Sequence, residues 1–304
     1  MHARTAWLGV ATVLGMAAGV AVAATPAYAI GATVALVENG VLKVTAAAGA
    51  YNDIEVDPSS TPGYYMVHDN QPISTGVGCK TVQGEVLCQV TNIWQVKIDG
   101  GDKNDILGVR GTIDTVLIGG FGNDTLDGSP SNDQLYGGDG HDDLDGKFGD
   151  DVLYGGPGDD VLDGDGGDDT LDGGPGADTL TGGSGFDVVS YRDSTDGVVA
   201  DLLGTRGDDG GEGEGDTINS DVEGIAGGRG HDRLTGNEGT NLLVGGFGDD
   251  LLTGLDGGDQ LFGEEGFDTL FGDAPRGEPG TGVDFCDPGR DGGQLFDCEE
   301  FPPE

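Results

Sequence analysis

The strongest constraint on the fold is a repeat of nine residues. From Gly119 to Ser190 the units read GGFGNDTLD, GSPSNDQLY, GGDGHDDLD, GKFGDDVLY, GGPGDDVLD, GDGGDDTLD, GGPGADTLT and GGSGFDVVS, and from Gly227 to Phe271 they read GGRGHDRLT, GNEGTNLLV, GGFGDDLLT, GLDGGDQLF and GEEGFDTLF. All thirteen units place Leu or Val at the eighth position, and twelve place Asp at the sixth, with Asn241 in the other unit. A disordered acidic chain has no reason to hold two positions in register. The pattern therefore predicts an ordered repeat structure.

These units resemble the nonapeptides of the repeats-in-toxin (RTX) family, hemolysin-type calcium-binding repeats, over residues 119–271. The resemblance implies calcium binding and a parallel β-roll. Each unit would form a turn of six residues, whose glycines allow positive φ, and a strand of three with one aliphatic side chain inward. Two units would make one coil. We therefore expect an all-β chain, a calcium-bound solenoid of nonapeptide repeats preceded by a small β domain.

Turns two units apart should stack on the same side of the roll. A cation between them can take an Asp carboxylate and carbonyl oxygens from each, an all-oxygen site that suits calcium better than magnesium or zinc. Residues 119–190 contain 18 Asp and no Glu, as expected for carboxylates that lie close to their own turn. We expect on the order of nine calcium ions. The candidate metal ligands are Asp124, Asp133, Asp142, Asp151, Asp160, Asp169, Asp178, Asp187, Asp232, Asn241, Asp250, Asp259 and Asp268.

The charge of the chain restricts its partners. Asp and Glu number 56 against 13 Lys and Arg, and the formal net charge is -43. Nucleic acid is excluded, because phosphate binding needs a basic surface. Calcium ions are the expected partners, with an extracellular surface or matrix component as a further candidate.

The N-terminus predicts a signal peptide at residues 1–29. Arg4 precedes an uncharged apolar run from Ala6 to Ala24, and Ala27-Tyr28-Ala29 is a small-x-small cleavage site. The alternative is a retained membrane anchor, since the run is nearly long enough to span a bilayer. With the signal removed, the mature chain has no membrane span, and we expect a secreted, extracellular protein.

Four cysteines fit an oxidising compartment. They allow three pairings, and their local spacing favours Cys79 with Cys88 and Cys286 with Cys298. The alternative is a metal site, but the cysteines lack CxxC spacing and have no His clustered with them.

Residues 30–99 predict a small all-β domain of short alternating strands. Asn39-Gly40 separates two β-rich runs, a strong hairpin signal, and Gln83-Gly84 lies in a second hairpin. Residues 100–271 would form the RTX array, beginning with a weaker unit at residues 100–107, and residues 272–304 a disulfide-containing C-terminal cap.

A degenerate segment, residues 191–226, interrupts the array. Its 36 residues equal four units. We weigh two interpretations, roughly two coils with a bulging loop at residues 208–215, or a linker between two separate rolls.

The sequence contains no HExxH, GxSxG or Walker motif. We therefore expect a protein that is not an enzyme, whose calcium-folded roll is a structural or interaction module. The alternative is a secreted hydrolase with an unrecognised active site in the N-terminal β domain, where His68, Ser59, Ser60 and Ser74 are the candidate groups. His141 and His231 occupy fifth positions of turns and are interpreted as exposed spacers.

Overall fold

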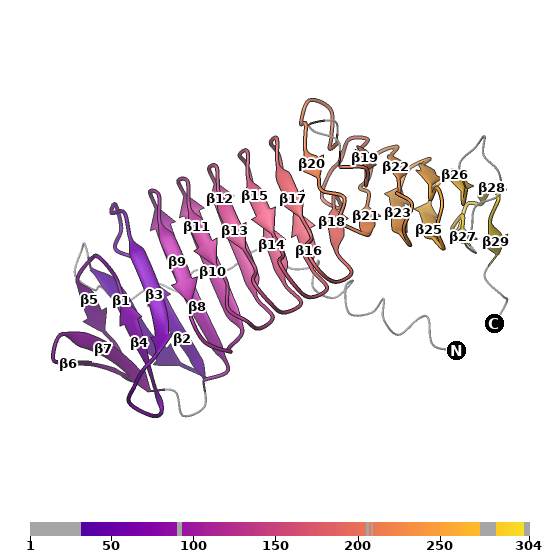
Figure 1. Ribbon diagram of the computed structural model, residues 1–304. Coiled ribbons are helices and arrows are strands. Elements are labelled where there is room, and N and C mark those ends of the chain that lie inside the picture. Colours follow the sequence, from indigo (N-terminus) through magenta and orange to yellow (C-terminus); the bar gives the residue numbers. More distant parts are fainter. Residues whose placement is uncertain (1–31, 90–92, 205–206, 208, 274–283, 301–304) are drawn as a thin grey trace.

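The computed structural model describes residues 32–89, 93–204, 207, 209–273 and 284–300, so the predicted signal peptide lies outside the described residues. The described chain is an elongated solenoid of short strands stacked along one axis (Figure 1). Its strands form three sheets of 14, 10 and 5 strands. Within the described ranges, no helix has the length and apolar character that a membrane crossing needs.

Sheet 1 runs the full length of the solenoid. Its strands, from the N-terminal end, are β5 (Ile73–Thr75), β1 (Thr33–Glu38), β2 (Val41–Thr45), β8 (Gln95–Asp102), β10 (Thr115–Phe121), β12 (Gln134–Asp139), β14 (Val152–Tyr154), β16 (Thr170–Asp172), β18 (Val188–Ser190), β21 (Gly224–Ala226), β23 (Leu242–Phe247), β25 (Gln260–Glu265), β27 (Phe285–Asp287) and β29 (Glu299–Glu300).

The opposite face is divided between sheets 2 and 3. Sheet 2 contains β6 (Cys79–Val82), β7 (Glu85–Gln89), β4 (Tyr64–His68), β3 (Asp53–Pro58), β9 (Ile106–Val109), β11 (Thr125–Asp127), β13 (Asp143–Asp145), β15 (Val161–Asp163), β17 (Thr179–Thr181) and β20 (Thr217–Ile218). Sheet 3 contains β19 (Val199–Asp201), β22 (Arg233–Thr235), β24 (Leu251–Thr253), β26 (Asp268–Phe271) and β28 (Gly293–Phe296).

The strands of the repeats pair in parallel, with a constant shift of two units. Leu153 pairs with Leu171 in sheet 1, and Leu144 pairs with Leu162 in sheet 2. The predicted parallel β-roll is therefore confirmed. In each three-residue strand the middle residue points inward, as the alternation of side chains requires.

The core is a double row of these inward aliphatic side chains. Every eighth-position residue is buried, and those of the first block, from Leu126 to Val189, are all 0% exposed. The core is narrow, because each coil contributes only one such residue from each sheet.

The N-terminal strands include both predicted hairpins. β1 and β2 pair with Glu38 opposite Val41, and Asn39 and Gly40 both have positive φ, as a tight primed turn requires. β6 and β7 form the second hairpin, with Cys79 opposite Cys88. β2 pairs in parallel with β8, and β3 with β9, so sheets 1 and 2 continue from these strands into the repeats. The division into a domain at residues 30–99 and an array stays a prediction.

The degenerate segment at residues 191–226 lies within the roll. Val188 in β18 pairs directly with Gly224 in β21, so 36 residues make one step along sheet 1. On the opposite face β20 adds to sheet 2 beside β17, and β19 begins sheet 3 beside β22. The segment is therefore one long coil, not the roughly two coils of our first interpretation, and its strands join both blocks.

Both predicted disulfides are present, Cys79–Cys88 and Cys286–Cys298. The second joins β27 to the residue before β29 at the C-terminal end of the roll, where Cys286 occupies an inward position and is 1% exposed.

Replacing an inward residue should lower the free energy of unfolding far more than replacing its outward neighbour. We expect Leu162→Ala to lower the free energy of unfolding of the calcium-saturated protein by about 2–5 kcal/mol, because it leaves a cavity in the narrow core. The matched control is Val161→Thr, at an adjacent site that is 45% exposed, with an effect of less than about 0.5 kcal/mol. Urea unfolding measures both, and equal losses would contradict the inward row.

Candidate metal-binding turns

The repeat turns lie along the two long edges of the roll. Edge 1 is defined by the turns that lead from sheet 1 to sheets 2 and 3, and edge 2 by those that return to sheet 1. The sixth-position residues on edge 1 are Asp124, Asp142, Asp160, Asp178, Asp232, Asp250 and Asp268, and those on edge 2 are Asp133, Asp151, Asp169, Asp187, Asn241 and Asp259. All thirteen are at most 3% exposed. The structure thus brings every candidate ligand into a buried row.

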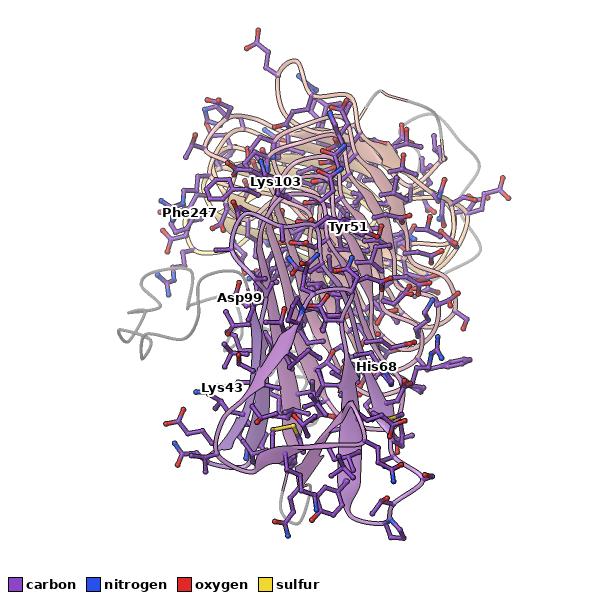
Figure 2. The ribbon with its side chains drawn as sticks, turned by 90° about the vertical axis from the view of Figure 1, so that its left-hand side faces the viewer. Lys43, Tyr51, His68, Asp99, Lys103 and Phe247 are labelled. Atoms are coloured by element: carbon purple, nitrogen blue, oxygen red, sulfur yellow. A yellow bond between two sulfur atoms is a disulfide. The ribbon has the colours of Figure 1, made fainter. Side chains whose placement is uncertain are left out.

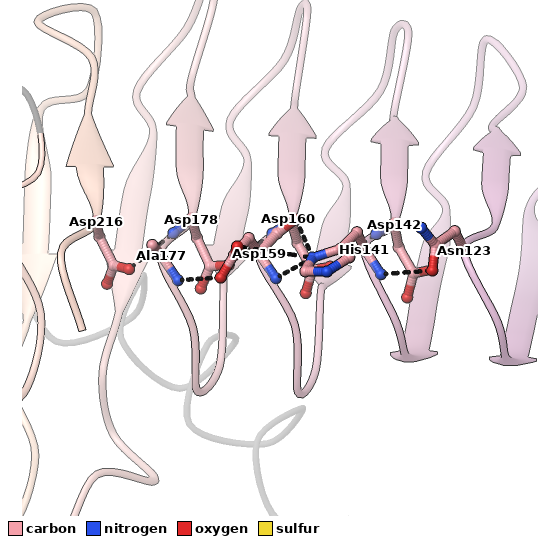
Figure 3. A network of polar contacts seen from close by, with 8 residues as sticks. All are labelled: Asn123, His141, Asp142, Asp159, Asp160, Ala177, Asp178 and Asp216. Atoms are coloured by element: carbon pink, nitrogen blue, oxygen red, sulfur yellow. Dashed lines mark hydrogen bonds and ion pairs between the residues drawn. The ribbon is translucent and has the colours of Figure 1, made fainter. Parts of the chain in front are cut away.

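One oxygen of each carboxylate holds the preceding coil. The Asp142 N–H donates to Asp160 Oδ1, and the Asp160 N–H donates to Asp178 Oδ1, both at 2.8 Å (Figure 3). The Asp151 N–H donates to Asp169 Oδ1 in the same way, at 2.7 Å. The short Asp side chain places its carboxylate beside the backbone N–H of the preceding coil, which agrees with the use of Asp and not Glu at this position.

The other oxygen of most of these carboxylates is buried without a hydrogen-bond partner. This holds for Oδ2 of Asp124, Asp142, Asp151, Asp160, Asp169, Asp178, Asp187, Asp250, Asp259 and Asp268. Burying a charged oxygen without a partner is costly. A row of such atoms fits a row of hard cations.

The first glycine of each turn shows where oxygens from two turns meet. A Cβ built on Gly155 would lie 2.5 Å from Asp160 Oδ2 and 2.6 Å from the carbonyl oxygen of Gly173, one coil further on. A side chain at this position would collide with both atoms. The carboxylate and the next carbonyl therefore approach one another, which is the mixed donor set that calcium takes.

Side chains alone do not form a metal site. Among the described residues, no group of three or more His, Cys, Asp or Glu side chains is arranged to hold a metal ion. An ion in these rows would therefore depend on backbone carbonyls as well as on carboxylates.

Comparison with known proteins agrees with this geometry. The model of the RTX calcium-binding nonapeptide repeat matches in four copies, at residues 118–153, 154–189, 225–252 and 253–274. The matched residues are thus similar to RTX calcium-binding nonapeptide repeats. The matches omit nearly all of the long coil, and no match was found among curated proteins.

Three sixth-position residues of the repeats differ from the others. The Ser129 N–H donates to Asp133 Oδ2, the Gly228 N–H to Asp232 Oδ2 at 2.7 Å, and the Asn237 N–H to Asn241 Oδ1 at 2.7 Å. In each case the donor is the second residue of the same turn, and the turn is the first RTX turn of its block on that edge. The oxygen that is unpartnered elsewhere is therefore already hydrogen-bonded.

Burial also changes the acidity of the rows. Burial raises the pKa of Asp151 and of Asp178 to about 8, although a backbone N–H donated to each lowers it. Burial likewise raises the pKa of Asp169 to about 7 and that of Asp160 to about 6. Burial thus disfavours the charged forms of these carboxyls, and a bound cation would stabilise those charged forms.

Four carboxylates outside our candidate set occupy equivalent places. Asp105 and Asp216 extend the edge 1 row, and Glu223 and Asp284 extend the edge 2 row. Irregular spacing hides two of them, since Asp216 follows Asp178 by 38 residues and Asp284 follows Asp259 by 25. The signal that could have found both is the tripeptide of Asp, any residue and a buried apolar residue, Asp216-Thr217-Ile218 and Asp284-Phe285-Cys286.

The two histidines are exposed, but they do more than space the turn. His141 Nδ1 accepts the Asp159 N–H at 2.8 Å, and His231 Nδ1 accepts the Asp249 N–H at 2.7 Å. Fifth-position Asn and Asp make the same bond in other turns, as when Asp159 Oδ1 accepts the Ala177 N–H (Figure 3). A second hydrogen-bond ladder therefore runs beside the sixth-position row.

Three of the groups considered for a hydrolase lie on different elements. His68 on β4 of sheet 2 lies 3.6 Å from Asp57 Oδ2, and Figure 2 shows it on the N-terminal part of the roll. Ser74 lies on β5 in sheet 1, and Ser59 Oγ accepts the N–H of Thr61 in its own turn. These contacts give that alternative no support.

Loss of a carboxylate with stacked neighbours on both sides should remove more calcium ions than loss of a carboxylate at the end of a row. Asp160 lies between Asp142 and Asp178, whereas Asp268 is the last sixth-position residue of the array on its edge. We expect Asp160→Ala to remove two calcium ions and Asp268→Ala one, because the ions lie between stacked turns. Isothermal calorimetry measures the number bound. Equal losses would count against sites between turns.

Acid should replace calcium as a stabiliser. Burial raises the pKa of Asp151 and Asp178 from 3.8 to about 8 and that of Asp160 to about 6, so the neutral forms of these carboxyls stabilise the fold below about pH 4. That stabilisation is lost as the pH rises toward about 8. In chelator, circular dichroism should show more β-structure at about pH 4.5 than at about pH 8, and calcium affinity should fall on acidification. A chelated spectrum independent of pH would contradict this.

Proposed function

We propose that this RTX protein is a secreted extracellular protein, without enzymatic activity, whose roll is folded by calcium and acts as a structural or interaction module. The observation that carries the proposal is the double row of buried carboxylates, most of which have one unpartnered oxygen. Because these buried carboxylates need calcium, the whole module folds or unfolds with the calcium concentration around it.

Calcium is needed because the apolar core of the array is too small to stabilise the fold without bound ions. Each nonapeptide buries one aliphatic side chain, which must offset the ordering of nine backbone residues. The net charge of -43 adds repulsion. Ions that bind only the folded chain supply free energy in proportion to their number.

The extracellular location accounts for the timing of folding. Extracellular calcium modules bind at about 10⁻⁴–10⁻³ M, so the array would stay unfolded in a cytosol low in calcium and fold after export. The two disulfides fit the same oxidising compartment, as does the predicted signal peptide.

An extracellular surface or matrix component is the proposed partner. The N-terminal strands and their connections lack RTX turns, and they carry exposed apolar groups at Val77 and Trp94, 81% and 60% exposed. A pull-down on cell surfaces with and without chelator would identify such a component.

Calcium should drive folding of the purified protein. We expect a cooperative gain of β-structure by circular dichroism at millimolar calcium, with little response to magnesium, which demands tighter octahedral geometry. The hydrodynamic radius should fall in parallel. Full β-content and an unchanged radius in chelator at neutral pH would defeat calcium-coupled folding.

A further inference from the structure

The outward face of sheet 1 between β2 and β16 carries two rows of side chains, which the strand register aligns from coil to coil. The first row consists of Lys43, Lys97, Val116, Gln134, Val152 and Thr170. The second row consists of Thr45, Asp99, Ile118, Tyr136, Tyr154 and Asp172. We call these two rows the strip. It holds two acids and two bases and is therefore electrically neutral, in a chain whose net charge is -43.

The outward face of sheet 2 over the same coils is acidic. Its strands β11, β13 and β15 carry Asp127, Asp143, Asp145 and Asp163, and β3 carries Asp53, Glu55 and Asp57. Figure 2 shows Lys43 and Asp99 of the strip on one side of the roll and His68 of sheet 2 on the other. Two copies of so acidic a protein repel one another through most of their surface. The strip is a face on which they do not.

The centre of the strip is aromatic and aliphatic. The rings of Tyr136 and Tyr154 stack with their centroids 5.0 Å apart and an interplanar angle of 7°. Ile118 precedes them in the second row, and Val116 and Val152 lie beside them in the first. All five side chains are partly exposed. An apolar, aromatic centre with charged groups toward its ends has the composition of a protein–protein interface.

The two rows complement one another in charge. The first row contains Lys43 and Lys97 and no acid, and the second contains Asp99 and Asp172 and no base. When two copies are placed face to face about a twofold axis parallel to the roll, the first row of each copy lies on the second row of the other. Lys97 of each copy then faces Asp99 of the other, and the valines face the isoleucine and the tyrosines.

The charges at the end of the strip are close to one another but are not paired. Burial raises the pKa of Asp99, and the charge of Lys97 on the same strand opposes that rise. Among the described residues, neither side chain forms an ion pair. Both are therefore available to a second copy.

We propose that the strip is a dimer interface, on which two copies of the chain pack face to face with their roll axes parallel. Six strands about 4.8 Å apart, with three residues of each facing outward or inward, give a strip about 29 Å long and about 10 Å wide. An interface of this size is weak and reversible. The inference goes beyond the proposed function, because it names a second copy as a partner and depends on the outward face of sheet 1, not on the turns.

The test is sedimentation equilibrium of the secreted chain in saturating calcium, from about 1 µM to about 1 mM. We expect the wild type to dimerise as its concentration rises. Lys97→Asp and Asp99→Lys each set like charges opposite one another and should weaken the dimer at least about ten-fold. The swap that combines both substitutions has the net charge of the wild type and should restore it. The matched control is Asp143→Lys, which makes the same charge change as Asp99→Lys at an exposed position of sheet 2 and should not weaken the dimer.

A further variant tests the centre of the strip without disturbing the fold. The Tyr136 hydroxyl donates to Gln134 Oε1 at 3.2 Å, and Gln134→Glu keeps both the shape and this acceptor. It places a charge against the aromatic centre of the second copy and should weaken the dimer at least about ten-fold. Circular dichroism in calcium confirms that each variant is folded.

A wild type that stays monomeric up to about 1 mM would overturn the proposal, as would strip variants that dimerise as well as the wild type. A folded swap that fails to restore the dimer would overturn the placement of the first row on the second. If the wild type is monomeric and the strip variants instead reduce retention in the cell-surface pull-down, the strip binds a different partner and self-association is wrong.

Discussion

The structure depends on carboxylates that are buried in the turns and are only half satisfied. In most RTX turns one oxygen holds the backbone of the preceding coil, and the other faces its own first glycine and the next carbonyl without a donor. The same residue therefore supplies both the hydrogen bond that stacks the coils and the charge that opposes stacking. A bound cation neutralises the charge of the carboxylate and leaves its hydrogen bond to the preceding coil intact. Folding of the repeats is therefore coupled to cation binding.

Three of the four turns that begin a row in either block satisfy their own sixth-position side chain. At Asp133, Asp232 and Asn241 the turn closes on itself, with its own second N–H donating to the sixth-position side chain. Such turns satisfy their carboxylate or amide internally at the margin of each block. At the other margin the chain adds charge, with Glu223 and Asp221 against Asp187. On edge 2, the first block therefore ends differently from the way in which it begins.

Much of this architecture was predictable, because each nonapeptide states its own geometry. Leu or Val at the eighth position and Asp at the sixth predicted the parallel roll, and local cysteine spacing predicted both disulfides. The long coil was not predictable from the repeat pattern. That pattern assumes that every nine residues form half a coil, whereas the 36 residues from Val188 to Gly224 form a single coil along sheet 1. Asp216 and Asp284 were missed for the same reason, since insertions before them break the period but not the stacking. Which atoms coordinate the ions, and how many ions bind, depends on backbone carbonyl oxygens. A residue pattern does not reveal their positions, so the ligand set and the number of ions stay predictions.

Sheet 1 passes without interruption through the long coil, while the opposite face is split between sheets 2 and 3. A pulling force along the axis of the roll would act on the bonds between coils in series, so the coils would peel away one after another. Each ordinary coil would release 18 residues, a contour of about 60 Å. The long coil would release twice as many at one step, about 120 Å, and it is supported by continuous pairing on one face only. Among the coils of the two repeat blocks, the largest single extension under tension would thus come at the junction between the blocks.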